Sequence, residues 1–96
     1  ALHDVCAAKK VPVWCGGLLE TGIGRAHNIA LATLPNFTLP GDISASERYY
    51  KEDLIDPPVT ITKTGTIRVP QSPGIGYTVL ESRVQKVSMR REVVLT

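Results

Sequence analysis

The sequence lacks the features that mark membrane, disulfide-rich and nucleic-acid-binding proteins. No apolar run approaches the ~18 residues needed to span a bilayer. It has only two cysteines, Cys6 and Cys15, which form no CxxC pair, and we expect both to stay reduced, as in a cytoplasmic protein. A formal net charge of +2 is too small a basic excess to indicate nucleic-acid binding. The composition therefore predicts neither a membrane nor a nucleic acid as a partner.

Metal-ligand spacing is also missing. The two histidines, His3 and His27, do not stand at zinc-ligand spacing from the cysteines. The acids Asp4, Glu20 and Asp42 make no metal triad by any spacing argument. The residues by themselves therefore predict no metal site in this chain.

Residues 11–42 carry the pattern of one unit of a parallel α/β sheet. Residues 11–15 (VPVWC) form a nearly continuous apolar run, which is typical of a strand covered on both faces and places Trp14 in the core. The glycines at 16 and 17 then allow a sharp turn or the close approach of a ligand. The elements expected after this turn are a helix near 23–34 with Thr21 as its N-cap, a strand at 37–39, and a turn at 40–42.

The remainder of the chain is expected to form shorter elements. Residues 1–9 read as the end of an amphipathic helix. Tyr49 and Tyr50 either pack locally or contact a neighbouring subunit. The other predicted elements are a short helix or loop at 43–56 that Ser44 or Ser46 caps, a hairpin of 59–61 and 66–69, a strand at 77–80, and a helical tail from 81.

A parallel strand needs parallel neighbours on both sides, and 96 residues are too few to supply them. The first helix also begins without a capping residue ahead of it. We therefore expect a segment of a larger enzyme, with the remainder of its own polypeptide as partner. The alternative is a free-standing small α/β binding or structural module without catalysis, which needs a self-contained core and a capped first helix.

Two stretches of the sequence resemble a known family. VPVWCGGLLETGIGRAHNIALATLPNFTLPGDISAS is similar to the seventh and eighth βα units of the N-succinylamino acid racemase / o-succinylbenzoate synthase family, in the muconate-lactonizing subgroup of the enolase superfamily. PPVTITKTGTIRVPQSPGIGY resembles the return of that family's chain into its capping domain. The resemblance implies an α/β fold. Residues 1–56 would be the C-terminal βα units of a TIM-like (β/α) barrel with its last two strands, and residues 57–96 a β-rich piece of the α+β capping domain.

The resemblance also implies a chemistry. The family removes a proton next to a carboxylate, with a divalent metal ion (Mg²⁺) that stabilises the enediolate and two lysines that act as acid and base. The family's metal ligands and lysines lie on earlier barrel strands, so this segment is expected to hold no catalytic residue and to be inactive alone. Lys9 and Lys10 precede a strand and are expected to be a solvated helix end. The implied substrate is a small carboxylate, the implied assembly a homo-oligomer, and synthase is not separated from racemase.

Binding contacts are expected at the two strand ends, because ligands of a parallel barrel bind there. By resemblance, Gly17, Leu18 and Leu19 line the pocket for the acyl side of the substrate; the alternative is a plain tight turn with core leucines. Asp42 is placed to orient a lysine or a substrate group, or else it is an Asx-turn or N-cap acid ahead of the next segment. Glu20 is expected to cap or pair near the start of the helix.

Overall fold

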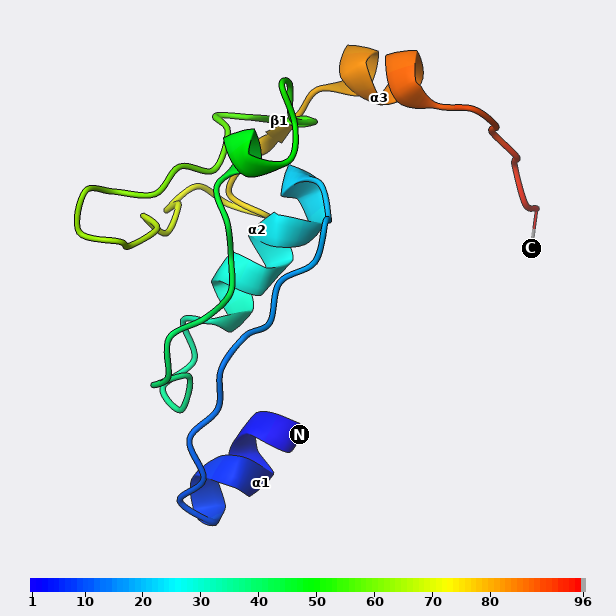
Figure 1. Ribbon diagram of the computed structural model, residues 1–96. Helices are drawn as coiled ribbons and strands as arrows, with labels where there is room; N and C mark the ends of the chain where they lie inside the picture. The colour runs from blue at the N-terminus through cyan, green and yellow to red at the C-terminus, as the bar shows by residue number, and fades with distance from the viewer. Residues whose placement is uncertain (96) are drawn as a thin grey trace.

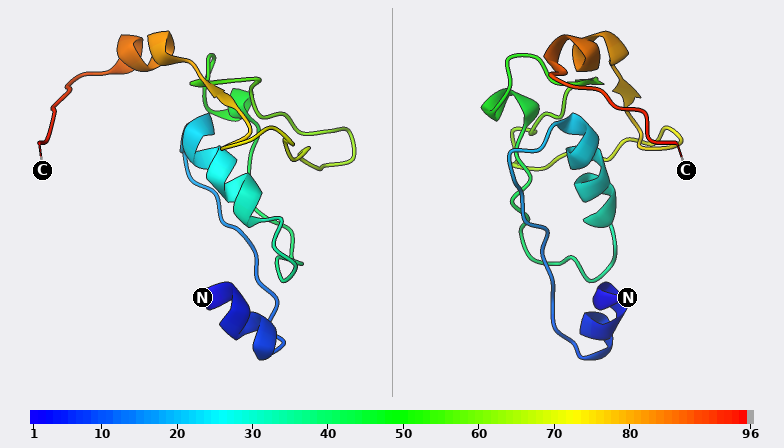
Figure 2. Two further views of the ribbon diagram at one scale, coloured as in Figure 1. Left: turned by 180° about the vertical axis from the view of Figure 1, so that it is seen from behind. Right: turned by 90° about the vertical axis from the view of Figure 1, so that its right-hand side faces the viewer.

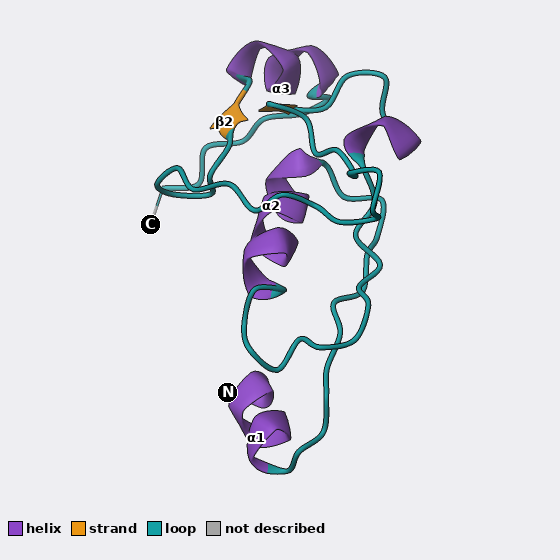
Figure 3. Ribbon diagram, turned by 90° about the vertical axis from the view of Figure 1, so that its left-hand side faces the viewer, coloured by secondary structure: helices purple, strands orange, loops and turns teal. Residues whose placement is uncertain are grey.

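The computed structural model describes residues 1–95; Thr96, the last residue of the predicted return segment, lies outside the described residues. The elements are α1 (Leu2–Ala8), α2 (Gly22–Leu31), the 3₁₀ turn η1 (Ser46–Arg48), β1 (Ile55–Asp56), β2 (Thr78–Val79) and α3 (Glu81–Val87). Long irregular segments join them, and α1 and α3 lie at opposite ends of the molecule (Figures 1, 2 and 3). Within residues 1–95, none of the helices is both long enough and apolar enough to cross a membrane.

The two strands predicted at 11–15 and 37–39 lie side by side in parallel. Val13 pairs with Phe37 in a parallel bridge, and the Val13 N–H donates to the Asn36 carbonyl at 3.1 Å. Further along, the Asp42 N–H donates to the Cys15 carbonyl at 2.8 Å. The parallel direction agrees with the prediction, but the pairing is a single bridge rather than a regular ladder.

Helix α2 occupies the predicted region but is shorter than 23–34, because it begins at Gly22 and ends at Leu31. Thr21 holds the N-cap position with an extended backbone, yet within residues 1–95 its side chain makes no capping hydrogen bond. Instead, the Asp53 carboxylate accepts a hydrogen bond from the Gly22 N–H at 2.7 Å. A residue 31 positions away therefore satisfies one of the free N–H groups at the start of this helix.

The second half of the chain contains less regular structure than predicted. The N-cap of η1 is Ala45, so neither Ser44 nor Ser46 caps it. The expected hairpin of 59–61 and 66–69 is a turn, in which the Thr62 N–H donates to the Thr66 carbonyl at 2.8 Å. The strand predicted at 77–80 is present as β2, which pairs antiparallel with β1, whereas the helical tail predicted from 81 is helical only as far as Val87, the end of α3.

A small hydrophobic core sits between α2 and the segment around β1. Its fully buried members are Ile29, Ile55 and Val59. Trp14 is 56% exposed, so the prediction that it lies in the core is wrong for this structure. The radius of gyration is 15.5 Å, whereas a compact domain of this length has one of roughly 12–13 Å. Much of the apolar surface is therefore left uncovered.

Replacing Ile55 with alanine should destabilise the fold by about 2–5 kcal/mol, since the side chain is 1% exposed and its loss leaves a cavity. Urea unfolding of the wild-type and variant proteins measures this difference. The matched control is Ile61→Ala, because Ile61 is 48% exposed and its truncation should cost far less. Equal losses in the two variants would contradict the position of the core.

Candidate functional site

The loop between Cys15 and α2 forms one wall of an open depression of about 500 Å³. Its lining residues come from the loop and from the first turns of α2: Gly16, Gly17, Leu18, Glu20, Gly24 and Asn28. Cys15, just before the loop, is buried, and this burial, followed by the negative charge of Glu20, raises the pKa of its thiol. Both Cys15 and Cys6 are free thiols.

Gly17 and Asp42 meet through their backbones. A Cβ atom added to Gly17 would lie 1.7 Å from the Asp42 carbonyl oxygen, which no side chain can accommodate. The ends of the two parallel segments are thus brought together. Asp42 is exposed, and its contacts with Gly17 and Cys15 are made by its backbone.

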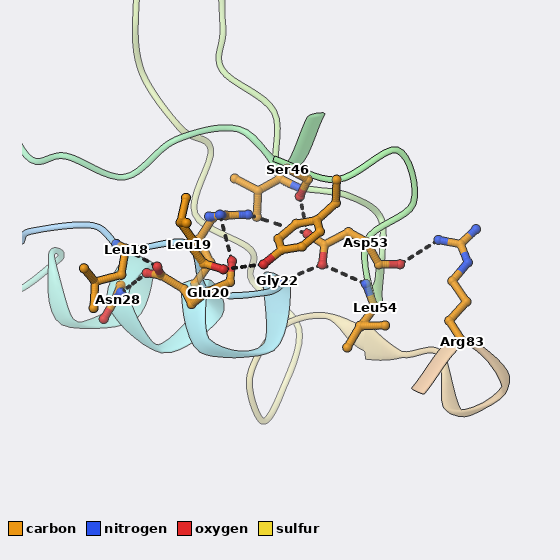
Figure 4. Close-up of polar contacts among 12 residues, drawn as sticks. Leu18, Leu19, Glu20, Gly22, Asn28, Ser46, Asp53, Leu54 and Arg83 are labelled. Atoms are coloured by element: carbon orange, nitrogen blue, oxygen red, sulfur yellow. Dashed lines mark hydrogen bonds and ion pairs between the residues drawn. The ribbon is translucent and has the colours of Figure 1, made fainter. Parts of the chain in front are cut away.

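Leu18 and Leu19 face outward. Their residues are 81% and 67% exposed, so they are not the core leucines of the alternative interpretation. Leu18 lines the depression, whereas Leu19 is not among its lining residues and is held through its carbonyl, which accepts a hydrogen bond from the Tyr50 hydroxyl. Tyr50 therefore makes a contact within this chain (Figure 4).

Glu20 holds the loop rather than capping α2. One carboxylate oxygen accepts a hydrogen bond from the Leu18 N–H at 2.8 Å, and the other accepts one from the Asn28 side-chain amide at 2.6 Å (Figure 4). Partial burial opposes ionisation of Glu20, but hydrogen bonds from backbone N–H groups and Asn28, together with the nearby Arg25 charge, lower its pKa. Glu20 is therefore a charged acceptor at neutral pH.

A buried ion pair between Arg25 and Asp53 lies next to the loop and is hydrogen-bonded to it. Arg25 Nη1 lies 3.6 Å from Asp53 Oδ2, and both side chains are almost completely buried. Asp53 also accepts hydrogen bonds from the N–H groups of Gly22 and Leu54 and from the Ser46 hydroxyl. The Arg25 side chain donates to the Glu20 carbonyl at 2.9 Å, which links the ion pair to the loop.

Arg25, Asn28 and Asp53 were not predicted as site residues from the sequence. A signal for Arg25 exists, since it falls on the same helical face as Gly22, Ala26 and Ile29, and a cation on that face requires a buried partner. Asp53 lies in a charged stretch that resembles a solvated loop, so its pairing with a residue far away in sequence depends on the fold.

No group of three or more His, Cys, Asp or Glu side chains in residues 1–95 is arranged to hold a metal ion. The described residues therefore offer no set of ligands for the Mg²⁺ ion that the family resemblance implies, and the resemblance assigns those ligands to earlier barrel strands. Lys9 and Lys10 are exposed and directly follow α1. They precede the strand segment that begins at Val11, whereas the loop follows that segment.

Comparisons with known proteins all point to one superfamily. The model of the family described as Enolase C-terminal domain-like matches residues 1–83. The chain is 53% identical over 92 residues to an o-succinylbenzoate synthase of Geobacillus stearothermophilus, which covers 96% of this chain and 24% of that protein. It is 53% identical over 87 residues to an N-succinylamino acid racemase of Amycolatopsis sp, with 91% and 23% covered.

Two solved structures resemble this chain. A member of the enolase superfamily from Listeria innocua matches with a TM-score of 0.82 and 46% identity, over 88% of this chain and 23% of that one. A muconate lactonizing enzyme from Klebsiella pneumoniae matches with a TM-score of 0.80 over 93% of this chain and 25% of that one, and at 20% identity it shows the fold alone. The chain spans about a quarter of the length of the proteins it matches.

Asp53→Asn should destabilise the protein by about 3–5 kcal/mol, because it leaves the buried Arg25 charge without a partner. Asp56→Asn removes an equal charge from an exposed position three residues away and is the matched control. Chemical denaturation compares the two variants. A loss below about 1 kcal/mol for Asp53→Asn would show that the ion pair is not essential.

The lowered pKa of Glu20 predicts a pH dependence. A carboxylate with a folded pKa below its ordinary value of 4.5 adds stability that is complete above that pH and is lost as the pH falls through the folded pKa. The stability difference between wild type and Glu20→Gln should therefore be largest at neutral pH and disappear in acid. Urea unfolding from about pH 7 down to about pH 3 measures it; a pH-independent difference would contradict the assignment.

Proposed function

Because this chain belongs to the Enolase C-terminal domain-like family of the enolase superfamily, we propose that it is part of an o-succinylbenzoate synthase or N-acylamino acid racemase. Such an enzyme removes a proton next to the carboxylate of a small substrate and passes through an enediolate. The 53% identity to relatives of both names supports this reaction class and favours neither name over the other.

In this proposal, residues 1–56 supply the last two strands of a (β/α) barrel and the residues from 57 onward return to the capping domain. The parallel bridge between Val13 and Phe37 supports the first part, since adjacent barrel strands are parallel. The match to a solved enolase-superfamily structure over 88% of this chain supports both parts.

The role of this chain is to bind the acyl side of the substrate with Gly17, Leu18, Leu19 and Asp42. The observation that carries this role is the outward-facing leucine pair on a fixed loop, at the end where the two parallel segments meet. Gly17 keeps the loop close to the Asp42 backbone, and Leu18 offers apolar surface in the depression. An aliphatic acyl group that covers these leucines removes apolar area from water.

The described residues do not form the metal cluster that this reaction class implies, so no chemical step is assigned to them. In the proposal, the Mg²⁺ ligands and the two lysines belong to the remainder of the polypeptide. The residues of this chain bind and orient; they neither take up nor deliver the substrate proton.

The exposed apolar surface supports a partner rather than a free-standing module. Leu2 and Trp14 are 82% and 56% exposed, while the fully buried core is small. The remainder of the same polypeptide is the partner that covers this surface. We also propose that the enzyme is a homo-oligomer, as the family resemblance implies. A cytoplasmic location is proposed as well, because both cysteines are free thiols.

The complete enzyme should turn over an N-succinylamino acid or the o-succinylbenzoate precursor when Mg²⁺ is supplied. Leu18→Ala in that enzyme should raise KM about tenfold, since the lost apolar contact is worth about 1–2 kcal/mol, with a smaller effect on kcat. Steady-state kinetics measures both. Leu95→Ala removes the same atoms from a side chain that is 91% exposed in the tail and should change neither constant. Absence of turnover, or an unchanged KM for Leu18→Ala, would refute the assignment.

A further inference from the structure

The loop of residues 16–21 combines exposed apolar side chains with a backbone that is held in place. Its leucines are among the most exposed large side chains of the chain, so apolar packing within the chain does not hold them. The loop backbone is nevertheless tied to its surroundings by side-chain hydrogen bonds (Figure 4). We propose that Glu20, with Asn28 and Tyr50, is a positioning residue that presents Leu18 and Leu19 to the acyl group of the substrate; this inference rests on the proposed function.

The carboxylate of Glu20 connects the loop to α2. It accepts from the Leu18 N–H at 2.8 Å and from the Asn28 amide at 2.6 Å, so its two oxygens have different partners. Asn28 lies in the second turn of α2, a rigid element, and Leu18 lies in the loop. Glu20 therefore ties the loop to the helix. Hydrogen bonds to a charged carboxylate are stronger than those between neutral groups.

Two further bonds hold the same loop. The Tyr50 hydroxyl donates to the Leu19 carbonyl, and the Arg25 guanidinium donates to the Glu20 carbonyl at 2.9 Å. Arg25 is 1% exposed and is paired with the buried Asp53. The loop is thus anchored on both sides of Leu19, and one of the anchoring groups, Arg25, is fixed in the protein interior.

Anchoring of this kind acts on substrate affinity. A loop that is free in the absence of substrate must be ordered when substrate binds, and that cost weakens binding. A loop that is already held in place avoids the cost. Loss of the Glu20 anchor should therefore raise KM more than it lowers kcat, and more for a succinyl than for an acetyl group, because the longer acyl group has more contact with the leucines.

A reciprocal exchange between Glu20 and Asn28 tests the inference in the complete enzyme. Asn28→Asp places a second carboxylate against Glu20, whereas Glu20→Gln alone is tolerated because the Asn28 amide can turn its oxygen toward the new NH₂ group. In the double variant, the amide introduced at position 20 donates to the carboxylate introduced at position 28, while its oxygen accepts from the Leu18 N–H. The bond between positions 20 and 28 is then restored with its direction reversed. Gln85→Glu, at an exposed position in α3, is the control for gain of charge.

We expect Asn28→Asp to raise KM for the N-succinyl substrate by about fivefold or more, with a smaller change in kcat and in KM for the N-acetyl substrate. The double variant should return KM to within about twofold of wild type. Hydrogen–deuterium exchange of the peptide that spans residues 16–21 should accelerate in Asn28→Asp and recover in the double variant. A purely structural role would lower the melting temperature without changing the ratio between the two substrates.

The outcomes separate this inference from the proposed function. If Leu18→Ala raises KM but Asn28→Asp does not, the positioning role of Glu20 is wrong and the acyl pocket stands. If Leu18→Ala has no effect, or the enzyme turns over neither an N-acylamino acid nor the o-succinylbenzoate precursor, the proposed function and the inference fail together. Unchanged exchange at residues 16–21 in Asn28→Asp overturns the inference whatever the activity.

Discussion

The buried ion pair between Arg25 and Asp53 joins more parts of the chain than its small hydrophobic core does. Through Asp53, the start of α2, the first residue of η1 and the segment before β1 share one carboxylate. The Asp53 carbonyl also accepts from Arg83 at 2.7 Å, which attaches α3. Charges this deeply buried are tolerated only when they are paired and hydrogen-bonded, so the positions of these four elements depend on one another.

The same pair extends its influence to the candidate site. Arg25 reaches the Glu20 carbonyl, and Glu20 reaches the Leu18 N–H. The chain of contacts runs from the interior to the exposed leucines without a break (Figure 4). The comparisons place the chain in the enolase superfamily, and in our proposal this surface faces the substrate. A rigid interior under an exposed, apolar loop is an arrangement suited to ligand binding.

Local patterns in the sequence were sufficient for the position of α2 and for the parallel direction of the segments at 11–15 and 37–39. Periodicity and glycine placement are local properties, and these features depend on them. The cap of α2 was assigned to Thr21 but comes from Asp53, since nothing near Thr21 encodes a contact across 31 residues. Trp14 was misplaced because burial depends on what lies against a strand, and its own residue type does not specify that.

The close approach of Gly17 to the Asp42 carbonyl has a consequence for changing the substrate range of such an enzyme. Position 17 accepts no side chain, whereas positions 18 and 19 point outward and already carry exposed ones. A combinatorial library that varies 18 and 19, while it keeps glycine at 17 and the Glu20–Asn28 pair, would sample new apolar surfaces on an unchanged backbone. Under the proposed function, changes at these two positions would alter acyl-group selectivity, while glycine at 17 keeps the loop backbone in place.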